Sequence, residues 1–538
     1  MAPSGPPPGE DGAGKAGART VRRQSREEGS GMSDAKVQSL EELAKTLERE
    51  RSRGRRIVHC HGVFDLLHPG HIRHLEAARR EGDVLVVTVT PDRFVNKGPG
   101  RPVFNQRLRA ESVAALVPVD HVAITDSPTA IEAIRALRPA VYVKGGDYAD
   151  PATDLTGKID DERVAVEAVG GRVHFTQEIT FSSSGLLNTH FDVYPEEAQA
   201  FLREFRTRYS GDAVVGALKR LRDVKALVIG DAIIDEYHYV QSMGKSPKEL
   251  LVATRYVREE HFAGGILACA NHLAGFCERV DLVTVLGSRD SCEAFIRAHL
   301  KPNVRPRFFM RPDTGTVVKR RFVEQAFLNK MFEIAFLDDT ELSPSIEEEI
   351  ATYLRGVLDQ YDLVLVADYG HGFLTSELVL VLASNARFLA VNAQTNSANT
   401  GFNLITKYPR ADYVCIDEPE VRLALHDRTS PMQDVIRRVA KHLTARRVAI
   451  TRGHHGSMTY EEQEGFCTVP VLSREVIDRI GAGDAYLGVT APCAAAGYPM
   501  DLVGFIGNAV GALAVRIIGN RTPVEPVPLF KFITALLK

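Results

Sequence analysis

Two histidines three residues apart stand where a short strand, predicted over residues 56–60, gives way to a helix. His68 and His71 close the run H-G-V-F-D-L-L-H-P-G-H at residues 61–71, and apolar residues follow at helical spacing. They therefore face the amides and the positive dipole end of a helix N-terminus, which is a natural place for polyphosphate. An imidazole there could hydrogen-bond a phosphoryl oxygen and stabilise charge while the α-phosphorus is attacked. The alternative is that both histidines only cap the helix.

A second run with the residue types for phosphate chemistry lies near the C-terminus. Residues 478–484 read D-R-I-G-A-G-D, and small apolar residues with helical character follow. Gly481 and Gly483 would let backbone amides face an anion at the start of that helix and hold charge on a transferring phosphoryl group. Asp484 beside them could take a proton from an attacking hydroxyl. A plain helix entry is the alternative reading.

The elements that must position the two histidines alternate between strand and helix. Strands are predicted at residues 83–90, 121–124, 140–144 and 171–175, with helices at 105–116 and 128–137 between them. This alternation is typical of a parallel sheet with helices on its faces. Ligand crevices of such sheets lie at the carboxyl ends of the strands, where the run V-K-G-G-D-Y at 143–148 stands.

Composition limits the class of protein. With 538 residues, 44% of them hydrophobic, the chain is too long for one ordinary domain and is typical of globular proteins. A net charge of −3 argues against nucleic-acid and anionic-membrane partners, and no apolar run is long enough to cross a bilayer. Seven cysteines without a C-x-x-C pair favour reduced thiols and a cytoplasmic location. Residues 1 to about 34 are predicted to be a disordered tail, and Met1 and Met32 both remain open as the start.

The longer pattern G-x-F-D-x-x-H-x-G-H resembles the nucleotidyltransferase superfamily, which includes cytidylyltransferases and the transferase half of bifunctional ADP-heptose synthases. The segments N-K-G-P-G-R-P-V, V-K-G-G-D-Y and F-S-S-S strengthen the resemblance to the synthases. It implies that His68 and His71 stabilise the transition state, that Lys97 and Arg107 neutralise phosphates, and that Mg²⁺ accompanies the triphosphate. It further implies a nucleotide pocket made of Gly62, Phe64, Lys144, Gly145, Asp147, Ser182, Ser183 and Ser184. His61 departs from the Thr or Asn usual in the family, although an imidazole could still donate to a phosphate.

The second half resembles the ribokinase-like (PfkB) sugar kinases, because its motifs come in the order of that family. They are G-D-x-x-x-D at 230–235, G-G at 264–265, D-E-P-E at 417–420, T-R-G at 451–453 and G-A-G-D at 481–484. The resemblance implies that Asp484 is the catalytic base and that Asp417 and Glu420 serve Mg²⁺. It places ATP phosphates on Gly453, Gly481, Ala482 and Gly483. It places the sugar on Asp231, Asp235, Gly264, Gly265 and Asp368.

Several positions depart from the kinase pattern. Ala268 replaces the Asn expected three places after the glycine pair, and N-A-Q-T-N at 392–396 replaces the Asp-Pro-Lys-Gly of heptose kinases. Asp417 stands where Asn is common, and Arg479 and Ile480 replace two threonines. The base and the anion hole are thus retained while the sugar pocket is altered. The domain order is the reverse of the familiar synthase, whose kinase comes first.

These observations predict an α/β protein with two doubly wound domains. We expect a tail and lead-in at 1–40, a Rossmann-like nucleotidyltransferase at 41–190, a helical connector at 191–222 and a ribokinase-like sandwich with a β lid at 223–538.

The leading hypothesis is a bifunctional enzyme of nucleotide-activated sugar biosynthesis, of the ADP-heptose type. It would use Mg²⁺, ATP or CTP, and sugar phosphates, and it would form a homodimer through the kinase lid. One alternative is a cytidylyltransferase for an alditol phosphate. Another is an active transferase joined to a non-catalytic kinase-like module for sensing or scaffolding.

Overall fold

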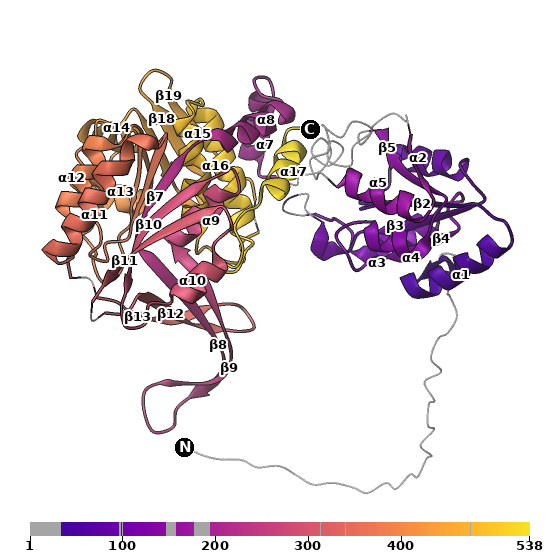
Figure 1. The fold of residues 1–538 in the computed structure, drawn as a ribbon, viewed down its shortest axis with the longest axis horizontal. Coiled ribbons are helices and arrows are strands. Elements are labelled where there is room, and N and C mark those ends of the chain that lie inside the picture. Colours follow the sequence, from indigo (N-terminus) through magenta and orange to yellow (C-terminus); the bar gives the residue numbers. More distant parts are fainter. Residues whose placement is uncertain are drawn as a thin grey trace, which may run out of the picture.

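A computed structural model describes residues 34–95, 98, 101–146, 158–176, 194–312, 314–338, 340–473 and 475–538. The described residues form two α/β bodies, and Figure 1 shows the first in indigo and violet and the second in magenta to yellow. The predicted fold class is confirmed. None of the described helices is long and apolar enough to cross a membrane, and all seven cysteines are free thiols.

The first body is built on a six-stranded, all-parallel sheet with the order β1-β4-β3-β2-β5-β6. Its strands are β1 (Val37–Gln38), β2 (Ile57–Gly62), β3 (Val84–Val89), β4 (His121–Ile124), β5 (Val141–Gly145) and β6 (Arg172–Thr176). Its helices are α1 (Leu40–Ser52), α2 (Pro69–Arg79), α3 (Gln106–Ala114), α4 (Ile131–Leu137) and α5 (Ile159–Ala168).

The strand order of the first sheet positions its site. The chain runs outward from β2 through β3 to β4, and then returns to the other side of β2 with β5 and β6. The sheet therefore has a topological switch point between β2 and β5, and ligands of such sheets bind at the carboxyl ends of these strands. All six residues of β3 are buried, as expected for a parallel strand covered on both faces.

The second body has a nine-stranded main sheet with the order β11-β10-β7-β14-β15-β16-β17-β18-β19, in which β18 alone runs antiparallel to the other strands. Its strands are β7 (Ala226–Gly230), β10 (Val280–Gly287), β11 (Val304–Arg311), β14 (Leu363–Asp368), β15 (Leu389–Ala393), β16 (Tyr413–Asp417), β17 (Arg447–Thr451), β18 (Ser457–Glu461) and β19 (Gly465–Val469). Strand β7 lies between β10 and β14, so its carboxyl end is again a switch point.

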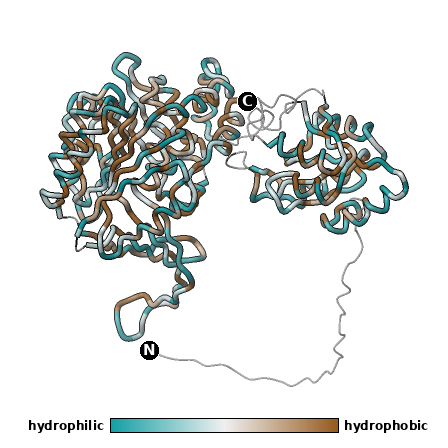
Figure 2. Tube along the Cα trace, viewed as in Figure 1, coloured by the Kyte–Doolittle hydropathy of each residue, from teal (hydrophilic) through white to brown (hydrophobic). Residues whose placement is uncertain are grey.

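Helices cover both faces of the main sheet, and its strands appear as brown, hydrophobic segments in the interior of Figure 2. These helices are α9 (Ile266–Ala274), α10 (Glu293–His299), α11 (Pro344–Val357), α12 (Ser376–Asn385), α13 (Glu418–Ala424), α14 (Met432–His442), α15 (Ala482–Ala495), α16 (Met500–Ala514) and α17 (Pro526–Leu536). A separate four-stranded sheet, here called the lid, has the order β13-β12-β8-β9. Its strands are β8 (Ala232–Lys245), β9 (Val252–Gly265), β12 (Val317–Glu324) and β13 (Lys330–Phe336).

Two helices of the segment expected to be a connector pack into the second body. Helices α7 (Glu196–Phe205) and α8 (Gly211–Arg220) contribute Leu202, Phe205 and Leu218 to its largest core cluster. The ring of Phe205 stacks on that of Phe505 in α16, with 4.3 Å between ring centroids. These helices are therefore part of the packed second body.

Candidate functional sites

His68 and His71 lie together at the start of α2, as expected. The Nδ1 atom of His68 accepts a hydrogen bond of 3.1 Å from the Gly70 amide, so this side chain caps the helix. The two imidazole rings stack with centroids 3.9 Å apart, and the ring of Phe64 lies 5.5 Å from that of His71. Because Nδ1 of His68 accepts, the neutral ring carries its proton on Nε2. The cap thus orients the imidazole as a donor.

A strained turn carries this motif from β2 to α2. Phe64 and Leu66 adopt positive φ angles of 51° and 49°, an arrangement that costs about 1–3 kcal/mol per residue and is typical of functional sites. Asp65 is 1% exposed, and its carboxylate accepts hydrogen bonds from the amides of Val103 and Phe104. The turn is therefore tied to the segment that leads into α3.

Arg109 on α3 is the second tie, and the sequence analysis did not identify it. Its side chain is fully buried and donates to the carbonyls of Val63, Thr90 and Phe104, and it pairs with Asp92 at 2.6 Å. Arg107, which was predicted to neutralise phosphate, has a side chain 74% exposed and pairs with Glu111 one turn along the helix. Its proposed role in phosphate binding stays a prediction.

The carboxyl end of β5 brings Lys144 and Gly145 beside the motif. The ammonium of Lys144 is 2.9 Å from the carboxylate of the buried Glu162 on α5. Both ring nitrogens of His61 are bonded to threonine hydroxyls, to Thr88 at 2.9 Å and to Thr90 at 3.2 Å. Within the sheet His61 thus has an anchoring role that the sequence analysis did not foresee. Gly62 ends β2 beside it. Lys97, Asp147, Ser182, Ser183 and Ser184 lie outside the described residues.

Asp484 lies in the first turn of α15, whose N-cap is Gly481 with φ of +82°. A Cβ atom at Gly481 would lie 2.0 Å from the Asn520 side chain, so this turn requires glycine. Asp484 is 8% exposed, and burial raises its pKa to about 6. Its carboxylate accepts a hydrogen bond of 2.7 Å from the hydroxyl of Tyr369, an interaction that lowers the pKa and that the sequence did not reveal. Ala482 and Gly483 complete the helix start.

Asp231 and Asp235 lie after β7, where they were predicted to bind sugar. Burial, followed by the nearby charge of Asp368, raises the pKa of Asp231 to about 7. Asp235 forms an ion pair with Arg321 of the lid. Gly264 and Gly265 end β9 opposite Ile233 and Ala232, and a Cβ at Gly264 would lie 2.0 Å from the Asp235 carboxylate. The glycine pair therefore makes room for Asp235.

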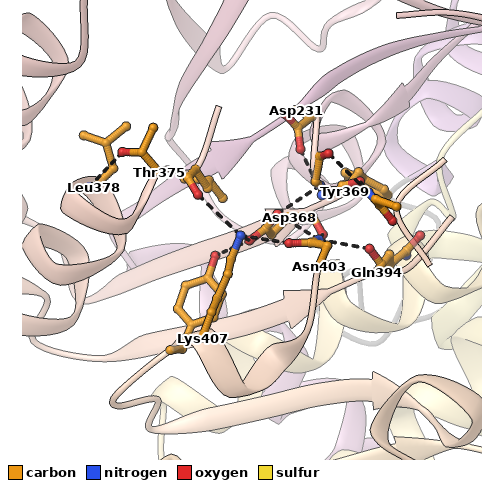
Figure 3. A network of polar contacts seen from close by, with 12 residues as sticks. Asp231, Asp368, Tyr369, Thr375, Leu378, Gln394, Asn403 and Lys407 are labelled. Carbon is orange, nitrogen blue, oxygen red and sulfur yellow. Dashed lines mark hydrogen bonds and ion pairs between the residues drawn. The ribbon is translucent and has the colours of Figure 1, made fainter. Parts of the chain in front are cut away.

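Asp368 has a different surrounding from the one expected of a sugar ligand. It is 0% exposed, and its carboxylate binds the ammonium of Lys407 at 2.6 Å and the hydroxyl of Tyr408 at 2.6 Å. The Asn403 amide donates to it at 3.1 Å, and Figure 3 shows this network between β14 and the loop that follows β15. Asp368 therefore anchors the loop that carries Gln394. Its predicted role in sugar binding stays a prediction.

A cavity of about 370 Å³ lies at the carboxyl ends of β16 and β17. Its lining residues are Asp417, Glu418, Pro419, Arg422, Arg452 and Gly453. Glu418 pairs with the guanidinium groups of Arg422 and Arg452. The cavity is thus lined by two arginines together with Asp417, predicted to serve Mg²⁺, and Gly453, predicted to bind phosphate.

Asp417 and Glu420 form the capping box of α13, and Thr451 donates to Asp417 at 3.1 Å. Burial raises the pKa of Glu420 to about 7, and the charge of Asp484 contributes to that shift. Among the residues that the structure describes, no group of three or more His, Cys, Asp or Glu side chains is arranged to hold a metal ion. Two carboxylates nonetheless fit Mg²⁺, which keeps several waters and is bound by one or two carboxylates together with substrate phosphates.

Comparison with known proteins agrees with this architecture. Residues 224–526 match the pfkB family of carbohydrate kinases, and residues 59–240 match the cytidylyltransferase-like family. Because the first match spans more than half of the chain, the protein belongs to the pfkB carbohydrate kinase family. A cytidylyltransferase-like domain precedes the kinase domain, so the predicted domain order is confirmed.

The chain is similar to the bifunctional protein HldE of Geobacter metallireducens, with 40% identity over 171 residues, 31% of this chain and 33% of that protein. HldE of Citrifermentans bemidjiense is 42% identical over 170 residues, 30% of this chain and 34% of that protein. The chain thus matches about a third of the length of these curated relatives. Among solved structures, phosphofructokinase-2 from Escherichia coli in complex with potassium is 14% identical with a TM-score of 0.48, covering 59% of this chain and 100% of that chain.

Proposed function

We propose that this protein is a bifunctional enzyme of nucleotide-activated sugar synthesis. One domain would phosphorylate a sugar or sugar phosphate from ATP, and the other would join a sugar 1-phosphate to a nucleotide and release pyrophosphate. The observation that carries the proposal is the presence, in one chain, of two sites built on helix N-termini at sheet switch points. One presents stacked imidazoles and the other presents a buried carboxylate.

In the kinase domain, Asp484 is the proposed general base. Its carboxylate would accept the proton of the acceptor hydroxyl, while the amides at the start of α15 would hold the transferring phosphoryl group. ATP would occupy the cavity lined by Asp417 and Gly453, with Mg²⁺ held by Asp417 and Glu420. The metal would neutralise phosphate charge. Asp231 and Asp235 would orient the acceptor.

In the transferase domain, His68 and His71 are the proposed donors to the attacked α-phosphate. The capping bond to Gly70 places the proton of the neutral His68 ring on Nε2, the atom that would donate to the phosphate, and the stacked ring of His71 would lie beside it. Charge that develops on the phosphoryl oxygens would be stabilised by these donors and by the α2 dipole. Lys97, Arg107 and Lys144 would neutralise the remaining phosphates.

The similarity to HldE proteins supports a substrate of the ADP-heptose type. The test is incubation of purified protein with ATP or CTP and a panel of heptose, hexose and pentose phosphates, with products read by mass spectrometry. We expect a nucleoside diphosphate sugar and pyrophosphate from the transferase, and an added phosphate from the kinase. Failure to form either product with every member of the panel would overturn the proposal.

A second candidate is a kinase domain that binds ligand without turnover. Two observations favour it. The hydroxyl of Tyr369 already donates a hydrogen bond to the Asp484 carboxylate, and Ala268 stands at the position where an Asn is expected to bind sugar. Calorimetry with ATP distinguishes the candidates when it is combined with the product assay. Binding of ATP without phosphorylation of any acceptor would favour the sensing module, whereas turnover would exclude it.

We also propose a homodimer through the lid. Strand β13 is the edge of this sheet, and its residues Phe332, Ile334 and Phe336 are 52%, 42% and 46% exposed. The partner would be β13 of a second copy, because an edge strand with exposed apolar residues can pair with the same strand of another molecule about a two-fold axis. Sedimentation should show a dimer that Phe332→Asp converts to a monomer, and a monomeric wild type would contradict it.

A further inference from the structure

A chain of side-chain hydrogen bonds joins β2 to β3 near their carboxyl ends. The Oγ1 atom of Thr88 lies 2.7 Å from Nε2 of His59 and 2.9 Å from Nδ1 of His61. The Nε2 atom of His61 lies 3.2 Å from Oγ1 of Thr90, the residue that directly follows β3. His59 and Thr88 are 0% exposed and Thr90 is 6% exposed. The inner members of the chain must therefore satisfy their hydrogen bonds with one another.

Both imidazoles of this chain are neutral. Burial, and then the charge of Lys144, lowers the pKa of His59 to about 3 and the pKa of His61 well below its usual value. A neutral imidazole donates from one ring nitrogen and accepts at the other, and a hydroxyl carries one proton to donate. Each of the two imidazoles and two hydroxyls therefore has one proton to place.

The buried end at His59 determines the direction of the chain. Its Nδ1 atom is buried and has no hydrogen-bond partner in the part of the chain that the structure describes. A proton on that atom would be a buried donor without an acceptor, which is costly, so the proton belongs on Nε2 and points to Thr88. The Thr88 hydroxyl then donates to Nδ1 of His61, because a proton on that nitrogen would leave the buried Thr88 hydroxyl without an acceptor. His61 consequently donates from Nε2 to Thr90.

This direction leaves the hydroxyl proton of Thr90 for an acceptor from outside the chain. The Thr90 amide donates to the Gly62 carbonyl at 3.0 Å, and Arg109 donates to the Thr90 carbonyl at 2.8 Å. The same arginine also holds the carbonyl of Val63. The hydroxyl therefore stands at the carboxyl edge of the sheet, beside the strand that leads into the turn before His68.

We propose that Thr90 donates this proton to a phosphoryl oxygen of a transferase substrate, and that Thr88 and His61 are positioning residues that orient it. The assignment rests on the proposed transferase function and adds a phosphate-binding residue to that same site. A phosphoryl oxygen suits this position, because the chain ends in a donor and the ammonium of Lys144 is near enough for its charge to act on His61. The nucleotide and the sugar 1-phosphate both carry such oxygens, and separate measurements with each substrate tell them apart.

NMR of the ring nitrogens, on full-length protein labelled at histidine, tests the direction of the chain. His59→Gln and His61→Gln assign the two sets of signals. We expect a proton on Nε2 and none on Nδ1 in both rings at neutral pH. A proton on Nδ1 of either ring would overturn the proposal.

The contact itself is tested by steady-state pyrophosphate release from full-length variants. Thr90→Val should raise KM for the nucleotide or for the sugar 1-phosphate on the order of 10-fold, with kcat little changed, because it removes one donor to a charged acceptor. Thr90→Ser keeps the hydroxyl and should behave like wild type. Thr125→Val is the matched control, because Thr125 directly follows the neighbouring β4 and its hydroxyl donates to the carbonyls of Val89 and Ser127. An unchanged KM for both substrates in Thr90→Val, or an equal rise in Thr125→Val, would refute the contact.

A double-mutant cycle tests whether Thr88 acts through Thr90. Thr88→Val should raise the same KM by a smaller factor, and it should add nothing in the Thr90→Val background. Additive effects would refute the positioning role.

Calorimetry separates this proposal from the proposed transferase function. If wild type releases no pyrophosphate with any sugar phosphate, that function fails, and binding of inorganic phosphate and tripolyphosphate then decides whether Thr90 contacts phosphate. Thr90→Val should bind one of these probes on the order of 10-fold more weakly than Thr125→Val does. Equal affinity of the two variants for both probes would overturn the proposal.

Discussion

At the scale of single residues, two opposing effects determine the pKa of the Asp484 carboxylate. Burial raises its pKa to about 6, and the hydrogen bond from Tyr369 lowers it. A general base acts only when it is ionised, so kcat/KM of the kinase should fall as the pH drops through this value.

Tyr369→Phe should move the acidic limb of that pH profile to higher pH. The substitution removes a bond that favours the ionised carboxylate, so the pKa of Asp484 must rise. Tyr408→Phe is the matched control, since Tyr408 donates to Asp368 and not to the base. The pH dependence of kcat/KM for both variants gives the answer. An unmoved limb in Tyr369→Phe, or an equal shift in both variants, would show that Asp484 is not the group that titrates.

At the scale of elements, α3 holds the strained turn of the transferase motif through one of its arginines. Arg109→Met should lower the free energy of unfolding of this domain by about 3 kcal/mol, because it leaves buried carbonyls without a donor. Transferase activity should fall with it, since Phe64 and Leu66 lose the clamp on their turn.

Arg107→Met is the control on the same helix. An exposed position of this kind changes stability by about 0.5 kcal/mol or less, while loss of a phosphate contact would lower activity alone. Denaturant unfolding and pyrophosphate release measured on both variants test the distinction. Equal stability of Arg109→Met and wild type would contradict the assigned clamp.

Local patterns predicted the elements well and their contacts only in part. The alternation of apolar residues predicted β4 at 121–124 and a helix that begins beside His68, because both depend on neighbours in sequence. Arg107 and Arg109 look alike in sequence. Which of the two is buried depends on which face of α3 packs against the sheet. The hydrogen bond from Tyr369 to Asp484 joins residues 115 positions apart, so no local pattern in the sequence can predict it. The same is true of the network that binds the Asp368 carboxylate to Asn403, Lys407 and Tyr408.

At the scale of the whole molecule, α7 and α8 belong with the kinase body. Arg206 donates to the Leu536 carbonyl at 2.6 Å, and Tyr209 donates to Asp501 at 3.0 Å. A fragment of residues 194–538 should therefore unfold cooperatively and retain phosphorylation. A fragment of 223–538 should aggregate or unfold at a lower temperature, because it exposes the apolar surface that Phe205 covers. Calorimetry and light scattering of both fragments provide the measurement, and equal stability of the two would contradict this assignment.

The central claim is that one chain carries two separate phosphate chemistries. The most direct test is a product assay on full-length wild type, His68→Ala and Asp484→Asn, with sugar phosphorylation and pyrophosphate release followed in the same samples by mass spectrometry. His68→Ala should lose nucleotidyl transfer on the order of 10²-fold or more and keep phosphorylation. Asp484→Asn should lose phosphorylation by roughly two to four orders of magnitude and keep transfer. If either variant loses both activities while remaining folded, or if neither loses its own, the assignment of two independent sites is wrong.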